Sequence, residues 1–113
     1  MDKMTQYRNL IKNLLTQHAQ LVGNQCPPEM ETILSLDEEH DQYLWLQMGW
    51  QKYHRVHGIT LHLRLHNDKI WIEQDWTESG IATDLLKAGI PNEDIVLGFR
   101  HPERRPFTEF AVA

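Results

Sequence analysis

Hydrophobic residues recur at steps of three and four over the first 22 residues of the chain. The positions that follow this spacing are Met4, Tyr7, Leu10, Ile11, Leu14, Leu15, His18, Leu21 and Val22. Such spacing gathers them on one side of an α-helix. Asp2 can cap the start of this helix, and Gly23 with Asn24 can end it. We therefore predict an amphipathic helix, followed by an irregular connection at Pro27-Pro28.

The pattern then changes to the two-residue alternation of β-strands. Residues 32–36 form a short β-rich segment, and the polar residues 37–41 separate it from a second strand at 43–51, which suggests a hairpin. Alternation in the second strand divides its side chains into Leu44, Leu46, Met48 and Trp50 on one face and Tyr43, Trp45 and Gln47 on the other.

A strictly alternating strand follows at 55–66. Its core face is predicted to hold Ile59, Leu61, Leu63 and Leu65, and its opposite face Thr60, His62, Arg64 and His66. Asn67-Asp68 suits a two-residue turn, because both residues tolerate positive φ. Closing the hairpin there predicts four cross-strand pairs, which are Leu65 with Ile70, Leu63 with Ile72, Arg64 with Trp71, and His62 with Glu73.

A second helix is predicted at 78–88, capped by Thr77 or Ser79 and ended by Gly89. One further turn at 92–94 leads to an apolar strand at 95–99, and the apolar C-terminus should dock on the body or on a partner. The chain is thus expected to form a single α+β domain over residues 1–113, with an N-terminal helix, an antiparallel sheet of four or five strands, one further helix and a docked C-terminal tail.

Composition narrows the possible functions. The chain has 113 residues, of which 41% are hydrophobic and 24% charged, which is typical of a globular domain and not of a disordered tail. Its formal charge of −5 argues against unspecific phosphate binding as the main activity. The lone Cys26 excludes an internal disulfide and is interpreted as a passive loop residue. We see neither a signal peptide nor an apolar stretch of ~20 residues, so the expected location is the cytoplasm.

The patterns for metal and catalytic chemistry are weak. Although there are seven histidines, His62 and His66 on one strand face would lie ~13 Å apart, too far to share a zinc ion. The acidic run 37–41 lacks the spacing of an EF-hand and reads as a solvated turn. No phosphate-binding loop or nucleophile motif is present. We therefore predict no catalytic residues, no metal and no cofactor.

Two groups of residues suggest binding instead. Tyr43, Trp45, Arg64 and Trp71 are expected to gather on the sheet face opposite the core, and aromatic residues with arginine are typical of interface hot spots. The alternative is that the chain's own helices or tail cover this face. If it binds a partner, Trp71→Ala and Arg64→Glu should weaken association without loss of the fold. Arg100, Arg104 and Arg105 form a second candidate set, for contact with nucleic acid.

Several ordered motifs resemble the XisI family. They are Tyr7-Arg8, Glu39-His40-Asp41 with Tyr43, Arg55-Val56-His57-Gly58, Asp68-Lys69-Ile70-Trp71-Ile72, Asp75 with Thr77-Glu78-Ser79-Gly80-Ile81-Ala82, Ala88-Gly89-Ile90-Pro91, Asp94-Ile95-Val96-Leu97 and Thr108-Glu109-Phe110-Ala111-Val112-Ala113. Together they span nearly the whole chain.

The resemblance implies a small α+β protein of the kind named excision controlling factors of the fdxN element, found mainly in cyanobacteria. It also implies a XisH-like partner that has an endonuclease-like fold. The XisI family itself has no established catalytic residues, so the resemblance assigns none to this chain. We accordingly expect a non-catalytic accessory factor that controls excision of a DNA element through a XisH-like protein, and a homodimer is compatible with this role. The rival interpretations are a direct DNA-binding excision factor, an inhibitor of a partner nuclease, and an uncharacterised enzyme.

Overall fold

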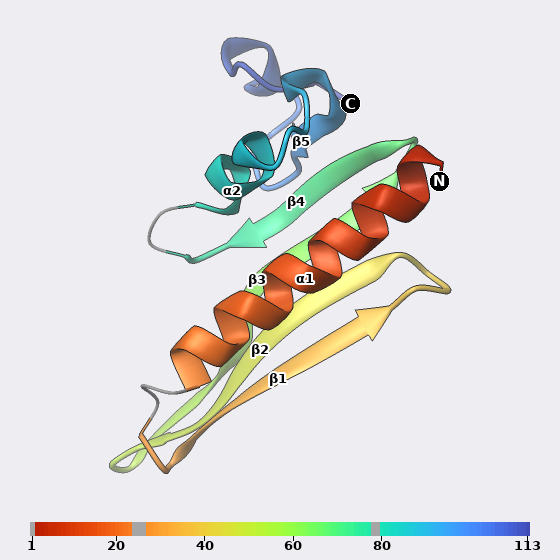
Figure 1. Cartoon of the computed structure of the whole chain (residues 1–113). Helices are drawn as coiled ribbons and strands as arrows, with labels where there is room; N and C mark the ends of the chain where they lie inside the picture. The colour runs from red at the N-terminus through yellow and green to blue at the C-terminus, as the bar shows by residue number, and fades with distance from the viewer. Residues whose placement is uncertain (1, 24–26, 78–79) are drawn as a thin grey trace.

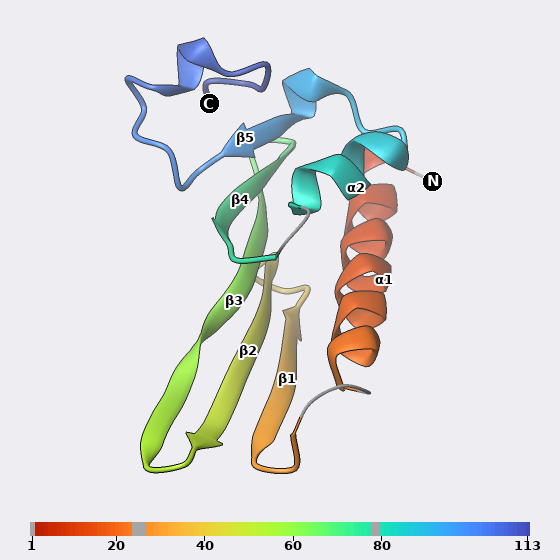
Figure 2. The ribbon, with the colours of Figure 1, turned by 90° about the vertical axis from the view of Figure 1, so that its left-hand side faces the viewer.

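Helix α1 (Lys3–Gly23) crosses one face of a five-stranded sheet (Figures 1 and 2). The computed structural model describes residues 2–23, 27–77 and 80–113, so Asn24 and Cys26 lie outside the described residues. Asp2 caps the helix as predicted, because its Oδ1 accepts a hydrogen bond from the backbone N–H of Thr5 at 2.8 Å. The apolar stripe predicted for this helix is confirmed from Met4 to Leu15, since Tyr7, Ile11 and Leu15 are buried, but Leu21 of the predicted stripe is 64% exposed.

The sheet has the order β1-β2-β3-β4-β5. Its strands are β1 (Met30–Asp37), β2 (Gln42–Gln51), β3 (His54–His66), β4 (Lys69–Asp75) and β5 (Ile95–Leu97). The first four strands are antiparallel, whereas β5 runs parallel to β4. A parallel neighbour requires a crossover connection, and α2 (Ile81–Lys87) with the short helix η1 (Asn92–Asp94) supplies it. The fold is α+β, as expected, but the sheet is only mostly antiparallel.

The hairpin between β3 and β4 confirms the predicted turn. Asn67 and Asp68 both have positive φ, of 53° and 62°. The predicted register holds next to the turn, where the pairs are Leu65 with Ile70, Arg64 with Trp71, and Leu63 with Ile72. It fails one pair further on, because a β-bulge places Gln74 opposite His62 and leaves Glu73 as the extra residue. The predicted pair of His62 and Glu73 is therefore wrong.

A second bulge, between β2 and β3, changes which side chains of β3 lie on each face of the sheet. Trp45 pairs with Leu61, but the next pair is Leu46 with Ile59, so Thr60 is the extra residue. Residues directly opposite each other in a sheet share a face. Ile59 therefore lies with Leu46 on the face away from α1, and its predicted place on the core face with Leu61 is wrong.

The division of β2 side chains between its two faces is as predicted, but the prediction of which face lies on the core side is wrong. Tyr43 pairs with Leu63 and Trp45 with Leu61, which puts both aromatic side chains on the core side, under α1. Their exposed fractions are 0% and 3%. Alternation could not decide between the faces, because both sides of β2 carry large apolar residues. Because α1 packs on the side of β2 that carries Tyr43 and Trp45, that side is the core face.

Helix α2 begins later than predicted, at Ile81, and the proposed cap Ser79 lies outside the described residues. The carboxylate of Asp75 acts at this end instead. Its Oδ2 accepts a hydrogen bond from the backbone N–H of Ile81, and its Oδ1 accepts one from that of Thr77, both at 2.8 Å. At the other end, Gly89 has φ of 96° and ends the helix as predicted.

The C-terminal tail docks on the body, as expected. It contains the short helix η2 (Arg105–Phe107) and then returns to β5. The backbone N–H of Ala111 donates to the carbonyl of Ile95 at 2.9 Å, and Phe110 packs against the core. Strand β5 is shorter than the predicted 95–99 segment, because the chain leaves the sheet after Leu97. Within the described ranges, no helix combines the length and the apolar character needed to cross a membrane.

Candidate interaction surfaces and polar anchors

Two clusters of polar side chains join the first two turns of α1 to the rest of the fold. In the first, Asp41 at the end of the β1–β2 turn accepts hydrogen bonds from Arg8 Nε at 2.7 Å and Nη2 at 3.2 Å, and from the Tyr43 hydroxyl at 3.0 Å. The hydrogen bond from Arg8 lowers the pKa of Asp41 despite its partial burial. Burial and the hydrogen bond to Asp41 raise the pKa of Tyr43. The motif residues Tyr7-Arg8 and Glu39-His40-Asp41 with Tyr43 thus meet in space.

The second cluster joins the start of α1 to η1. The Tyr7 hydroxyl donates to Asp94 Oδ2 at 2.5 Å, and Lys3 Nζ lies 3.0 Å from the same oxygen. Burial alone would raise the pKa of Asp94, but the hydrogen bonds from Tyr7 and Lys3 outweigh it and hold this pKa below its ordinary value. Both perturbed carboxylates therefore have structural partners.

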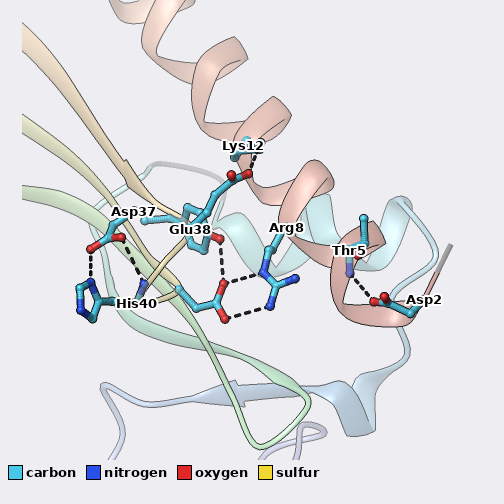
Figure 3. A network of polar contacts seen from close by, with 9 residues as sticks. Asp2, Thr5, Arg8, Lys12, Asp37, Glu38 and His40 are labelled. Carbon is cyan, nitrogen blue, oxygen red and sulfur yellow. Dashed lines mark hydrogen bonds and ion pairs between the residues drawn. The ribbon is translucent and has the colours of Figure 1, made fainter.

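The acidic turn 37–41 forms its own local contacts (Figure 3). Asp37 accepts hydrogen bonds from the backbone N–H and the Nδ1 of His40, which lower the pKa of Asp37. Glu38 forms an ion pair with Lys12 of α1. Residues 38–40 are exposed, as predicted for a solvated turn, but Asp41 at the end of the run is half-buried and binds Arg8 and Tyr43, so the prediction holds only in part.

The four residues predicted to bind a partner do not share one face. Tyr43 and Trp45 lie in the core beneath α1, whereas Arg64 and Trp71 pair with each other on the opposite face of the sheet. The prediction of a common surface is wrong, and the reason is the orientation of β2 described above. Of the four, Arg64 keeps the most accessible side chain, with 29% of it exposed.

Trp71 lies between two arginines. The guanidinium carbons of Arg64 and Arg105 are 5.1 and 5.2 Å from the centre of its ring, and its Nε1 donates to the carbonyl of His66 at 3.1 Å. Only 8% of Trp71 is exposed. Replacing it by alanine would therefore remove packing under the C-terminal tail, contrary to the expectation that Trp71→Ala leaves the fold intact.

Arg105 is also held within the fold, unlike its two predicted companions. Its guanidinium donates to the backbone carbonyls of Arg100, Gly98 and Val112 at 3.1–3.4 Å. Arg100 and Arg104 are exposed and line a hollow together with Phe107, which is 86% exposed. The structure thus brings two of the three predicted arginines to one surface beside an aromatic ring.

A groove on the helix-covered side was not predicted. It has a volume of about 360 Å³ and lies between the end of α1, the bulge in β3 and the segment after β4. Leu21 and Trp76 are among its lining residues and are 64% and 75% exposed. His18, another lining residue, is held by Asp84 of α2 at 2.8 Å. No local pattern joins these residues, since they come from segments distant in the sequence.

The histidines show no arrangement for metal binding in the part of the chain that the structure describes, where no group of three or more histidine, cysteine, aspartate or glutamate residues could hold an ion. His62 has a partner of another kind, because its Nε2 lies 2.7 Å from Oε1 of Gln42. Burial lowers the pKa of His62.

These features define a class: a small α+β protein whose helices cover one sheet face and leave much of the other open, with exposed aromatic and basic side chains at separate surfaces. The chain belongs to the XisI family, since the family model described as XisI protein matches residues 1–112. No curated protein matches the chain.

Two solved structures agree with this assignment. A XisI-like protein from Anabaena variabilis is 36% identical, with a TM-score of 0.90, and the match covers 96% of this chain and 98% of that one. The fdxN element excision controlling factor XisI from Anabaena variabilis is 46% identical, with a TM-score of 0.86, and the match covers 99% of this chain and 100% of that one.

Proposed function

We propose that this chain is a non-catalytic accessory factor that controls the excision of a DNA element of the fdxN type, acting through a XisH-like protein. One observation carries the proposal. The chain matches, over almost the full length of both proteins, a structure named as an fdxN element excision controlling factor. Identity of 46% at this coverage supports a shared role.

The placement of the titratable groups supports a role without catalysis. Asp41 and Asp94 have lowered pKa values because of Arg8, Tyr7 and Lys3, which hold α1 in place. Perturbed pKa values can mark catalytic groups, but ion pairs that hold a fold together perturb them as well. The second explanation fits these carboxylates.

Co-purification with a XisH-like protein tests the proposal. We expect a complex that persists when the salt concentration is raised, because an interface built on apolar and aromatic contacts is weakly screened. Failure of the two proteins to associate at either salt concentration would contradict the proposal.

Two variants would locate the contact. Arg64→Glu changes the face away from the helices, and Trp76→Ala changes the rim of the groove on the helix side. Loss of a hot-spot residue should weaken the complex about 30-fold or more. Glu109→Ala, at an exposed position of the tail, is the matched control and should leave the affinity unchanged.

Direct DNA binding is the second candidate, and the hollow formed by Arg100, Arg104 and Phe107 favours it. Cationic side chains beside an exposed ring suit phosphates and stacked bases. This function predicts an affinity for DNA that falls steeply with salt, and a shallower salt dependence in the double variant Arg100→Ala/Arg104→Ala. Arg105 contributes less to such a surface, because its donors are bound to backbone carbonyls.

A further inference from the structure

The sheet face opposite the helices is open over β1, β2 and β3. Both helices pack on the same side of the sheet, and the tail lies at the β5 end (Figure 2). The centre of the open face is apolar and consists of Ile33, Leu44, Leu46, Met48 and Ile59, each of which is half-buried within its own sheet. We call this area of β1–β3 the open face.

The strand register arranges the open face in rows across the three strands. The middle row is wholly apolar, with Ile33, Leu46 and Ile59 side by side. The next row on one side is Glu31, Met48 and His57. On the other side, the row Ser35, Leu44 and His62 is followed by Asp37, Gln42 and Arg64. Acidic groups therefore lie on β1, and histidine and arginine lie on β3, where Arg64 also has Glu73 of β4 as a neighbour at 3.4 Å.

This pattern is complementary to itself under one particular two-fold rotation. If two open faces stack with the axis along β2, each β1 lies over the β3 of the other copy. Glu31 then faces His57, Asp37 faces Arg64, and Ile33 faces Ile59. Leu46 and Met48 meet their own copies at the axis. Every row thus pairs an acceptor with a donor or an apolar residue with an apolar one.

The other two-fold axis in the plane of the faces, perpendicular to the strands, gives the opposite result. It would place β1 over β1 of the second copy, so that the strands carrying Glu31 and Asp37 face each other. It would also place β3 over β3, so that Arg64 faces no carboxylate of β1. Like charges at such an interface cost several kcal/mol, so the charge pattern selects the axis along β2.

We propose that the occupant of the open face is a second copy of this chain, stacked face to face with the two-fold axis along β2. Two sheets packed in this way lie ~10 Å apart and bury the side chains between them. The proposal is independent of the proposed role in excision, because it concerns the chain alone.

The first test is the molar mass of the chain alone at about 100 μM, far above the micromolar Kd of a weak specific dimer. We expect a dimer for the wild type. Leu46→Lys should weaken it by about a hundredfold or more, because two ammonium groups would meet at the axis. Leu21→Lys, an equal change at an exposed position of α1, is the control and should remain dimeric.

A compensating pair tests the direction of the axis. Ile33→Lys alone should weaken the dimer at least tenfold, because it places an unpaired charge against Ile59 of the second copy. Adding Ile59→Glu should restore most of the affinity, because the introduced ammonium group of one copy would then face the introduced carboxylate of the other. The two positions lie on either side of Leu46, two strands apart, so they do not pair within one chain.

A monomeric wild type at this concentration would overturn the proposal, as would a dimer that survives Leu46→Lys with its fold intact by circular dichroism. Failure of Ile59→Glu to rescue Ile33→Lys would overturn the axis along β2. If Leu46→Lys does not fold, Met48→Lys takes its place, since Met48 also lies at the axis. None of these results depends on a XisH-like protein, so they are separate from the test of the proposed function.

Discussion

Gly98 lies just after β5, directly against the side chain of Glu73. A Cβ atom at this position would be 2.9 Å from Glu73 Cδ, closer still to its Oε1, and 3.2 Å from the carbonyl oxygen of Ile72. Glu73 is the extra residue of the β4 bulge, and its Oε1 lies 3.4 Å from Arg64 Nε. Arg64 in turn packs over Trp71. The absence of a side chain at Gly98 thus leaves room for the ion pair that holds Arg64 on the indole.

Gly98→Ala should therefore destabilise the protein by about 1–3 kcal/mol, because Glu73 must leave its position and break the contact with Arg64. Gly58→Ala is the matched control, since a Cβ there would have no atom within 4 Å and the change should alter stability by less than about 0.5 kcal/mol. Urea unfolding of both variants measures the difference.

A double-mutant cycle identifies the cause. In a Glu73→Ala background the added methyl group at position 98 no longer meets the carboxylate, so its cost should shrink to the closer approach to Ile72. An equal cost of Gly98→Ala in both backgrounds would contradict this account.

At the scale of the elements, two carboxylates with lowered pKa values bind the first two turns of α1, in addition to the contacts of Lys12 with Glu38 and of His18 with Asp84. Asp41 binds Arg8, and Asp94 binds Tyr7 and Lys3. Both carboxyl groups have a lowered pKa in the folded state. A group of this kind stabilises the fold at pH values above the unfolded pKa of about 3.9, and the stabilisation is lost as the pH falls through the lower folded pKa.

Stability should therefore change little from neutral pH down to about 5 on account of these two groups, and their contribution should decline below about pH 4. Asp94→Asn should cost about 2 kcal/mol at pH 7, because it removes a charged acceptor from Tyr7 and Lys3. The difference from the wild type should shrink at pH 3, because the carboxyl group of the unfolded wild type is largely protonated there and ionised Asp94 then stabilises the fold less. Denaturant unfolding at the two pH values measures this, and a difference that grows on acidification would be the wrong sign.

At the scale of the whole molecule, one sheet face is buried under the helices and the other is accessible to solvent. Leu63 is fully buried between the sheet and the helices, whereas Leu46 lies next to the β2–β3 bulge, on the open face. The fold needs the first face to be filled by α1 and α2. It leaves the second accessible for another molecule.

The same substitution should consequently have opposite effects on the two faces. Leu63→Asp should abolish folding, because it places an unpaired charge in the core. Leu46→Asp should keep the fold, since water reaches this face in the monomer, and should reduce self-association. Near-ultraviolet circular dichroism and size-exclusion chromatography distinguish the outcomes, and a folded Leu63→Asp variant would contradict the assignment of the faces.

Features that depend on neighbours in the sequence could be predicted without the structure. The stripe of α1 follows from a spacing of three and four residues, and the turn at Asn67-Asp68 follows from two residues that tolerate positive φ. The stop at Gly89 has a similar local cause. The motifs that resemble the XisI family also pointed to the correct family.

The placement of the candidate site required the tertiary structure. Both faces of β2 are apolar, so only the packing of α1 decided that Tyr43 and Trp45 are core residues and that Leu46 is not. Each bulge inserts one residue, which moved Ile59 to the open face and Glu73 away from His62. The helix stripe and the turns arise from contacts between near neighbours in the sequence. The face that a strand presents depends on the distant element that covers it, and alternation alone carries no information about that element.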